Sequence, residues 1–348
     1  MSDISFYKNK RVFITGHTGF KGTWLCHILL EAGADITGYS LTPPTDPSLF
    51  EQTGIEKDIS SLIADIRDRD KLIKKVIETK PDIVFHLAAQ PLVRLSYREP
   101  ALTYETNVMG TVNILEAIRL TPSIRSFVNV TTDKVYENKE WDWGYRENEN
   151  LCGFDPYSNS KSCSELVTHS YRNSFFVDKE TSAVSTARSG NVIGGGDYSE
   201  DRIIPDCIRA VQAGTEIIVR NPNSTRPYQH VLDTLCGYLL LAEKQSNDKK
   251  AEGAYNFGPD DESCLSTGEL AELFCLSWGN GASWKVQNDS GPHEANYLKL
   301  DCTKAKKIFG WKPFWNIKTA VNKTVEFAKC KTDAERTACL KDQIREYF

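Results

Sequence analysis

The fold is decided by RVFITGHTGFKG, residues 11–22, where a short apolar run leads directly into a glycine-rich turn. Gly16, Gly19 and Gly22 follow the spacing GxxGxxG, and an amphipathic stretch begins near Phe20. In such a corner the first glycine permits a tight turn, the second lets the backbone approach a pyrophosphate, and the third lets helix and strand pack closely. Free N–H groups at the helix start attract the same anion. The stretch predicts the first strand–turn–helix unit of a dinucleotide-binding fold, with a ligand-free glycine turn as the alternative.

Strand and helix patterns alternate through the first half of the chain. The strand patterns are rich in Val, Ile and Phe, as expected for strands that helices cover on both faces. They lie at 11–15, 35–40, 82–88, 126–131 and 182–188, with helical patterns starting near Phe20, Arg69, Ala101 and Pro156. Alternation of this kind requires right-handed crossovers and predicts an α/β fold with a Rossmann-type, doubly wound parallel sheet.

The pattern changes at the glycine-rich turn GNVIGGGD, which begins at Gly190. Beyond it we expect a helix near 201–213, a strand near 216–220, a loop at NPNSTRP, a long helix near 231–246 and a strand at AYNFG. We interpret 1–189 as the cofactor-binding domain, with contributions from about 228–258. Residues 190–348 would form mainly a smaller, interleaved substrate-binding lobe.

Composition narrows the class of protein. The 348 residues carry 42 basic and 47 acidic side chains, a formal charge of −5, which argues against a nucleic-acid or membrane-surface partner. The ten cysteines form no CxxC pair, so neither a zinc ribbon nor any other metal site is predicted. The N-terminal MSDISFYKNK lacks an apolar signal core, and no run of 18 apolar residues occurs. We therefore expect a cytoplasmic protein with free thiols.

The second strand pattern bears on which dinucleotide is bound. It ends at Ser40, where an acid that grips the adenosine ribose is usual, and the following LTPPTDPSLF contains no arginine for a 2′-phosphate. The missing arginine favours NAD over NADP. Asp65 either contacts the adenine or caps a helix. Ala88 and Ala89, in HLAAQ, are small enough for a cofactor to lie against the backbone, or simply pack in the core.

Two segments together indicate acid–base chemistry. TTDKVY (131–136) follows a strand pattern, and YSNSK (157–161) opens a helix directly after a proline. Tyr157 and Lys161 are four residues apart and share a helical face, so the ammonium should lower the phenol pKa. The phenol could then remove a hydroxyl proton, with Thr132 aligning the hydroxyl. YxxxK alone is weak evidence; its position after a dinucleotide turn gives it weight.

Six segments together carry a resemblance to a known family. GHTGFKG, HLAAQP, TTDKVY, YSNSK, RSGNVIGGGD and RPYQHV resemble nucleotide-sugar 4,6-dehydratases of the extended short-chain dehydrogenase/reductase superfamily, over roughly residues 8–330. The resemblance implies a hydro-lyase in which NAD is reduced and reoxidised within one turnover. C4 of the sugar is oxidised, water leaves across C5 and C6, and C6 is reduced.

The resemblance also implies roles for individual residues. Tyr157 would be the base at O4, with Lys161 as its partner, and Asp133 the acid at the departing C6 oxygen. Where related dTDP-glucose enzymes have a glutamate that removes the C5 proton, this chain has Lys134. That lysine would act as a neutral base or stabilise the enolate, and it points to the branch that uses CDP-glucose.

The resemblance extends the two expected binding sites. The cofactor site would comprise Gly16, Thr18, Gly19, Phe20, Gly22, Ser40, Asp65, Ile66, Leu87, Ala88, Ala89, Asn107, Tyr157 and Lys161. The substrate site would comprise Gln90, Asn191, Arg202, Arg220, Arg226, Tyr228, His230, His293 and Tyr297, with Arg226 as the foremost diphosphate contact.

Other expectations concern assembly and competing functions. Helices at 101–119 and 156–176 are the expected contacts of a homodimer. A 4-epimerase of the same fold, or another sugar-nucleotide dehydratase, is the nearest alternative, although an epimerase has no use for the pair Asp133–Lys134. An inactive NAD-sensing regulator is the alternative of another class, and the presence of both Tyr157 and Lys161 disfavours it.

Overall fold

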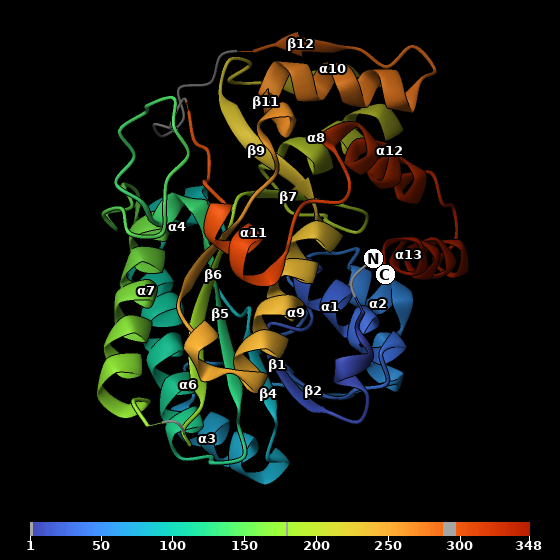
Figure 1. The fold of residues 1–348 in the computed structure, drawn as a ribbon. Helices are drawn as coiled ribbons and strands as arrows, with labels where there is room; N and C mark the ends of the chain where they lie inside the picture. The colour runs from blue at the N-terminus through green and yellow to red at the C-terminus, as the bar shows by residue number, and fades with distance from the viewer. Residues whose placement is uncertain (1–2, 179, 288–296) are drawn as a thin grey trace.

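The computed structural model describes residues 3–178, 180–287 and 297–348. Its centre is a seven-stranded parallel sheet with the order β10-β6-β5-β4-β1-β2-β3 (Figure 1). The strands are β1 (Arg11–Thr15), β2 (Asp35–Ser40), β3 (Ser60–Ile63), β4 (Ile83–His86), β5 (Ser126–Thr132), β6 (Ala183–Ser189) and β10 (Ala254–Phe257). The strand order reverses between β1 and β4. In sheets of this kind, ligands bind beyond the carboxyl ends of the strands at such a reversal.

Alternate side chains of the central strands enter two separate cores. Ile14 of β1 packs with α1 (Phe20–Glu31) and α9 (Val231–Asn247) on one face, whereas its neighbour Phe13 packs with α3 (Arg69–Thr79) and α6 (Gly110–Arg119) on the other. Helix α7 (Pro156–Phe175) also covers the second face. Since both faces are buried, the strands are apolar along their whole length, as the sequence predicts.

The second lobe has its own core. Strands β11, β9 and β7 form one small sheet, and β12 pairs with β8. Apolar side chains of these strands and of the lobe's helices pack together, among them Ile204, Val219 and Phe274. The elements of the lobe are β7 (Asn191–Ile193), α8 (Ile203–Gln212), β8 (Ile217–Val219), β9 (Thr225–His230), β11 (Cys264–Ser266), α10 (Thr267–Trp278), β12 (Trp284–Val286) and α12 (Ile317–Ala328).

The two parts are interleaved along the chain. After β9, α9 returns to pack against α1 and β5, and β10 then joins the edge of the central sheet beside β6. The remaining helices are α2 (Leu49–Thr53), α4 (Val93–Arg98), α5 (Pro100–Tyr104), α11 (Thr303–Phe309) and α13 (Asp333–Tyr347), with a π-helical turn at Glu105–Met109. Within the described ranges, no helix combines the length and apolar character that a bilayer crossing needs.

The predicted doubly wound sheet is confirmed, and β1 and β2 have the predicted bounds. Several details differ. Strand β3 was not predicted, because Ser60–Ile63 is a short edge strand with two serines and little burial. Strand β7 (Asn191–Ile193) lies within the stretch that was expected to be a glycine-rich turn. The loop expected at NPNSTRP is shorter than predicted, because β9 already begins at Thr225 and pairs with β7 and β11.

Candidate active site

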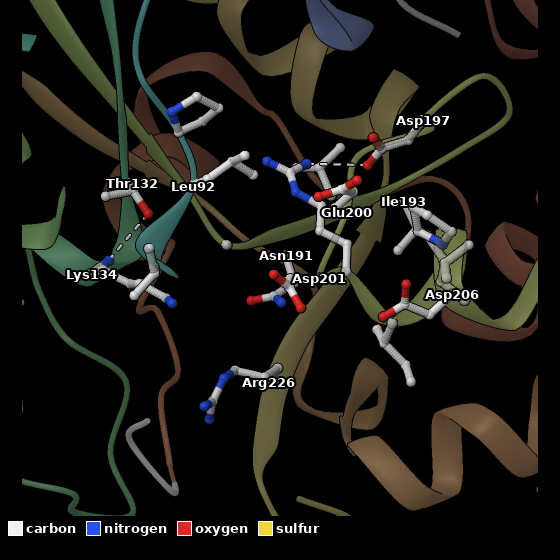
Figure 2. A pocket seen from close by; sticks show the side chains of 18 of the residues that line it. Leu92, Thr132, Lys134, Asn191, Ile193, Asp197, Glu200, Asp201, Asp206 and Arg226 are labelled. Atoms are coloured by element: carbon white, nitrogen blue, oxygen red, sulfur yellow. Dashed lines mark hydrogen bonds and ion pairs between the residues drawn. The ribbon is translucent and has the colours of Figure 1, made fainter. Parts of the chain in front are cut away.

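A cavity of about 510 Å³ lies between the carboxyl ends of the central strands and the second lobe. One side, which we call the catalytic wall, consists of Thr132, Asp133 and Tyr157. The other side, the arginine wall, consists of Arg202, Arg220 and Arg226. Figure 2 shows Thr132 and Lys134 on one side of the opening, with Asp197 and Asp206 across from them. Lys134, Asn191 and Tyr228 also line the cavity, so the fold brings most of the expected residues together.

Tyr157 is held at the catalytic wall by the start of α7. Asp155 caps the helix by accepting a hydrogen bond of 3.0 Å from the N–H of Ser158, and Pro156 occupies the first turn. Thr132, at the end of β5, lines the same cavity. Burial raises the phenol pKa to about 12, while the Arg202 guanidinium and the Thr132 hydroxyl oppose the rise.

Lys161 lies one turn after Tyr157 in α7 and is buried. Its Nζ donates a hydrogen bond of 3.0 Å to the carbonyl oxygen of Val130 in β5. Burial lowers the pKa of this amine to about 8, and Glu165 opposes the fall. The cation that most lowers the phenol pKa is Arg202 from the other lobe, and the contribution expected of Lys161 stays a prediction. Helical spacing alone could not show this, since it ignores distant segments.

Asp133 and Thr132 form a tight pair at the end of β5. The Thr132 hydroxyl donates to Asp133 Oδ1 at 2.9 Å and accepts the backbone N–H of Lys134 at 3.3 Å. Asp133 is only 2% exposed, and its Oδ2 has no hydrogen-bond partner among the described residues. Burial raises the pKa of this carboxyl group, which Lys134 and Thr132 oppose. A buried carboxyl group with one unused oxygen suits a general acid.

The glycine corner fits a dinucleotide. Gly16 has φ +78°, and a Cβ there would lie 2.6 Å from the backbone N of Ala88. A Cβ on Gly22 would lie 2.1 Å from the Gly16 carbonyl oxygen, so this glycine lets α1 pack on the turn. A Cβ on Gly19 would meet nothing closer than 3.5 Å, which leaves its outer side open. Gly19 also precedes α1 without a side-chain cap, so the first N–H groups of the helix can receive a pyrophosphate.

The far end of this corner is polar and partly closed. Thr18 hydrogen-bonds Ser40 at 2.9 Å, so both expected cofactor residues lie together where β1 and β2 end. Asp65 binds Arg67 at 2.7 Å, while Asp68 caps α3 by accepting from Lys71. The helix-cap alternative for Asp65 is therefore wrong. Its possible contact with adenine stays a prediction.

Arg202 and Arg220 of the arginine wall are already paired with carboxylates of their own lobe. Arg202 binds Asp197 at 3.1 Å, and Arg220 binds Asp201 at 2.8 Å. Arg220 also reaches Asp206 at 3.3 Å. These pairs are partly exposed, so they hold the guanidinium groups in place without much net stabilisation. A diphosphate would have to share the guanidinium groups with these carboxylates or displace them.

Several expected residues have other roles or lie elsewhere. The side chain of Gln90 binds Thr103 and the backbone of Leu92, and Asn107 binds the Gln90 backbone and Ser160. Both amides are committed to holding the loop after β4, so a direct contact of Gln90 with substrate is corrected. His230 is fully buried, caps α9 and packs edge-on against two tryptophans, so its assignment to the substrate is corrected too.

The last two expected substrate residues in the sequence, His293 and Tyr297, are not among the described residues that line the cavity. Tyr297 bridges to Thr225 of β9 and is not among the described residues that line the cavity. Its role in binding stays a prediction. His293 lies outside the described residues. Ile66, by contrast, packs under Gly110 in the core beside α6, where a Cβ on Gly110 would lie 2.9 Å from Ile66 Cγ2.

Lys21, the lysine within GHTGFKG, lines the cavity although the motifs did not single it out. Its Nζ lies 3.2 Å from Ser189 Oγ, and its side chain lines the cavity near the catalytic wall. Burial lowers the Lys21 pKa to about 7, and the cations Arg202 and Lys161 lower it further, against the carboxylates Asp133 and Asp197. The signal was present, since a lysine directly before the third glycine lies in the first turn of the helix, beside the expected ligand.

The fold and the cavity define a Rossmann-type enzyme with an acid–base site beside a dinucleotide corner. The chain belongs to the GDP-mannose 4,6 dehydratase family, whose model matches residues 13–324. It is 48% identical to a CDP-glucose 4,6-dehydratase of Salmonella typhimurium over 100% of this chain and 99% of that protein. It is 28% identical to a dTDP-glucose 4,6-dehydratase of Streptomyces antibioticus over 91% of each.

Solved structures agree on the fold. A UDP-glucuronic acid 4-epimerase from Bacillus cereus superposes with a TM-score of 0.80 at 20% identity, covering 92% of this chain and 99% of that one. A dTDP-glucose 4,6-dehydratase from Bacillus anthracis gives 0.77 at 20% identity, with 91% and 96% covered. Dehydratases and epimerases therefore share this scaffold, and the side chains in the cavity must decide the reaction.

Proposed function

We propose that the chain converts CDP-glucose to CDP-4-keto-6-deoxyglucose as an NAD-dependent hydro-lyase. The 48% identity to a CDP-glucose 4,6-dehydratase over the whole chain carries this proposal. The cavity supports it independently, because Thr132, Asp133, Lys134 and Tyr157 surround one space beside the glycine corner. NAD is supported by the fit of Gly16, Gly19 and Gly22 to a pyrophosphate and by the NAD complexes among structures of the same fold.

Each catalytic residue has a task that its position supports. Tyr157 receives the proton of the C4 hydroxyl, and Thr132 holds that hydroxyl in line. NAD, when bound at the glycine corner, supplies a temporary store for the electrons that leave C4. The resulting ketone acidifies the proton on C5. Asp133 then protonates the C6 oxygen as it departs as water, a step that its raised pKa favours.

Lys134 serves the intermediate formed after C5 loses its proton. Its charge already lowers the pKa of Asp133, so it lies close enough to act on the same end of the sugar. A charged amine there stabilises the enolate, and a neutral one removes the C5 proton. Exchange of the C5 hydrogen with deuterated solvent in a Lys134→Met variant distinguishes these roles: exchange persists if the amine only stabilises charge.

A 4-epimerase is the second function that this fold supports. An epimerase needs only the proton at O4, so Asp133 and Lys134 would have no task. The buried acid with an unused oxygen therefore favours dehydration.

Product analysis tests the proposed function. The purified protein is incubated with CDP-, dTDP-, GDP- and UDP-glucose, and the products are weighed by mass spectrometry. We expect CDP-glucose to lose one water, and to do so faster than dTDP-, GDP- or UDP-glucose. Formation of CDP-galactose with no loss of water would show an epimerase instead.

Assembly and biological setting belong to the same proposal. We infer a homodimer through α5–α6 and α7, which pack together and leave Met109, Leu166 and Phe175 half-exposed. Leu166→Lys should shift the mass measured by light scattering from two chains to one.

We also infer that the protein acts in the cytoplasm, where its ten cysteines would stay reduced. Its 4-keto-6-deoxy sugar product would supply the synthesis of lipopolysaccharide O-antigen. We place the cofactor domain at 1–189 with about 228–258, and the substrate lobe mainly at 190–348.

A further inference from the structure

Helix α7, which carries Tyr157, buries a polar face. Its fully buried residues are all polar: Ser158, Ser160, Lys161, Ser162, Ser164, Glu165 and Thr168. Apolar packing is non-directional, so an apolar face alone would not determine how far a helix lies along a strand. Hydrogen bonds depend on distance and angle, so a polar face holds the helix at one position.

Two side chains of β5 donate hydrogen bonds to this polar face. Asn129, near the middle of the strand, donates to the Ser164 hydroxyl at 2.9 Å. Thr131, near its end, donates to Glu165 Oε1 at 2.5 Å. Thr131 directly precedes Thr132 of the catalytic wall. The bond to Glu165 therefore joins α7 to the strand one residue before the site.

Glu165 is a buried carboxylate that uses both of its oxygens. It is 3% exposed. Oε1 accepts from Thr131 and from Arg188 Nε at 2.8 Å, while Oε2 accepts from Thr186 at 2.6 Å and from Arg188 Nη2 at 2.9 Å. Burial opposes the charge, but Arg188 and the two hydroxyls outweigh burial and hold the pKa of Glu165 below its ordinary value. A bidentate ion pair of this kind fixes both partners in one geometry.

The ion pair also reaches the turn Asp133–Val135, which follows β5. Arg188 Nη1 donates to the hydroxyl of Tyr136, the next residue of the chain, at 2.8 Å. Arg188 is itself only 2% exposed. Helix α7, the end of β5 and the turn after it therefore meet at one buried pair, Glu165 with Arg188.

We propose that Glu165 is a positioning residue for the proposed reaction. Its bond to Thr131 fixes where α7 lies along β5, and thereby where the phenol of Tyr157 lies relative to the Thr132 hydroxyl. A displacement of about 1 Å at reacting groups can lower a rate about 10²-fold. The inference deepens the proposed function and rests on it.

An ion pair that served stability alone would behave differently. Such a pair contributes little net stability, because the loss of hydration of both charges opposes their attraction. Every hydrogen bond to Glu165 would then have the same small effect on catalysis. If Glu165 determines position, the bond from β5, which carries Thr132, should affect kcat more than the bond from the neighbouring strand β6.

The decisive comparison is between Thr131→Val and Thr186→Val. The two threonines are 4% and 3% exposed, and each change keeps the size while removing one hydroxyl that donates to Glu165. The bidentate bond from Arg188 stays in place in both variants. Thr131 lies in β5, whereas Thr186 lies in β6, which contributes nothing to the catalytic wall. Steady-state kinetics with CDP-glucose, calorimetric binding of CDP and the thermal midpoint are measured for each variant.

We expect Thr131→Val to lower kcat about 10-fold while the Kd of CDP stays unchanged. The helix would be displaced and not released, since Asn129 and Lys161 still tie α7 to β5. Thr186→Val should lower the thermal midpoint by a similar amount but change kcat far less. Thr131→Ser restores the hydroxyl and should recover most of kcat. Equal losses of kcat in the two valine variants, or a normal kcat in Thr131→Val, would overturn the proposal.

Glu165→Asp tests position from outside the cavity. Thr131 lines the cavity, whereas Glu165 is not among the described residues that do. The aspartate keeps the charge that Arg188 needs but is shorter by one methylene, so the hydrogen bonds can re-form only if α7 moves. We expect kcat to fall about 10²-fold, with an unchanged Kd of CDP as evidence that the variant is folded. A folded variant with normal kcat would contradict the positioning role; if the variant does not fold, the two valine variants decide.

Failure of the proposed function gives a different result. If the wild type converts another nucleotide-linked sugar, or forms a 4-epimer, the assignment to CDP-glucose dehydration is wrong. Tyr157 would take the O4 proton in either reaction. The ratio of kcat between Thr131→Val and Thr186→Val, measured with that reaction, then judges the role of Glu165.

Discussion

The two walls of the cavity differ in how they treat charge. The catalytic wall buries its groups, so the pKa values of Tyr157 and Asp133 both rise and both groups hold protons more firmly. On the arginine wall, Arg202 and Arg220 are partly exposed and pair locally with carboxylates, as in Arg220 with Asp201, where the side chains are 29% and 43% exposed. Burial tunes proton transfer, whereas exposed ion pairs mainly position charge. Chemistry and affinity should therefore be separable by mutation.

The largest expected effect comes from the catalytic wall. Tyr157→Phe removes the only oxygen of this side chain that can exchange a proton with O4, so kcat should fall by about 10²–10⁴. CDP affinity and the thermal midpoint should change little, because the ring remains. Steady-state kinetics with CDP-glucose and calorimetric binding of CDP measure the two quantities. A variant that retained normal kcat would show that the phenol has no catalytic part.

An intermediate effect should come from the arginine wall. Arg220→Met removes a charged donor from the cavity, and such hydrogen bonds contribute about 1.5–3 kcal/mol, so the Kd of CDP should rise by roughly 10- to 100-fold. Arg209→Met is the matched control, since Arg209 also binds Asp206 but does not line the cavity. If kcat fell by a larger factor than Kd rises, the arginine wall would contribute to the chemical step as well as to affinity, which would contradict the separation of the two walls.

The smallest effect concerns Lys21, which lies between the walls. Its folded pKa of about 7 is below the ordinary 10.5, so the folded chain binds fewer protons than the unfolded chain between these pH values. The free energy of unfolding should rise with pH across that window, and Lys21→Met should lose this rise. Because the side chain is partly exposed, the slope should stay well below the maximum of about 1.4 kcal/mol per pH unit. Urea unfolding of both proteins at pH 7 and 9 measures the difference.

The sequence predicted the central sheet well because local patterns determine it. Apolar runs ending in glycine or small residues identified β1 and β2 and the corner between β1 and α1. The edge strand β3 escaped notice, since two serines and little burial give it no such pattern. Tyr157, Thr132 and Asp133 were found because they end or begin elements whose positions the pattern already determines.

The rest of the site depends on contacts between segments far apart in the chain. Arg202 approaches Tyr157 only because α8 begins across the cavity, and neither spacing nor periodicity reports that approach. His230 was misread for a related reason: Tyr228 lines the cavity, but His230 ends β9 and caps α9 within the core. The carboxylate partners of Arg202 and Arg220 could likewise not be predicted, because the fold of the second lobe brings them together.

The place of β10 has a practical consequence for anyone who divides this molecule. The chain crosses from the large sheet to the small lobe at β7 and returns through α9 to an edge strand. If the chain were divided at a single point near residue 190, the large sheet would lose its edge strand β10 and the helix α9 that covers one of its faces. Grafting a foreign sugar-recognition module onto this scaffold therefore requires exchanging separate inserts on either side of α9 and β10, not swapping one terminal half.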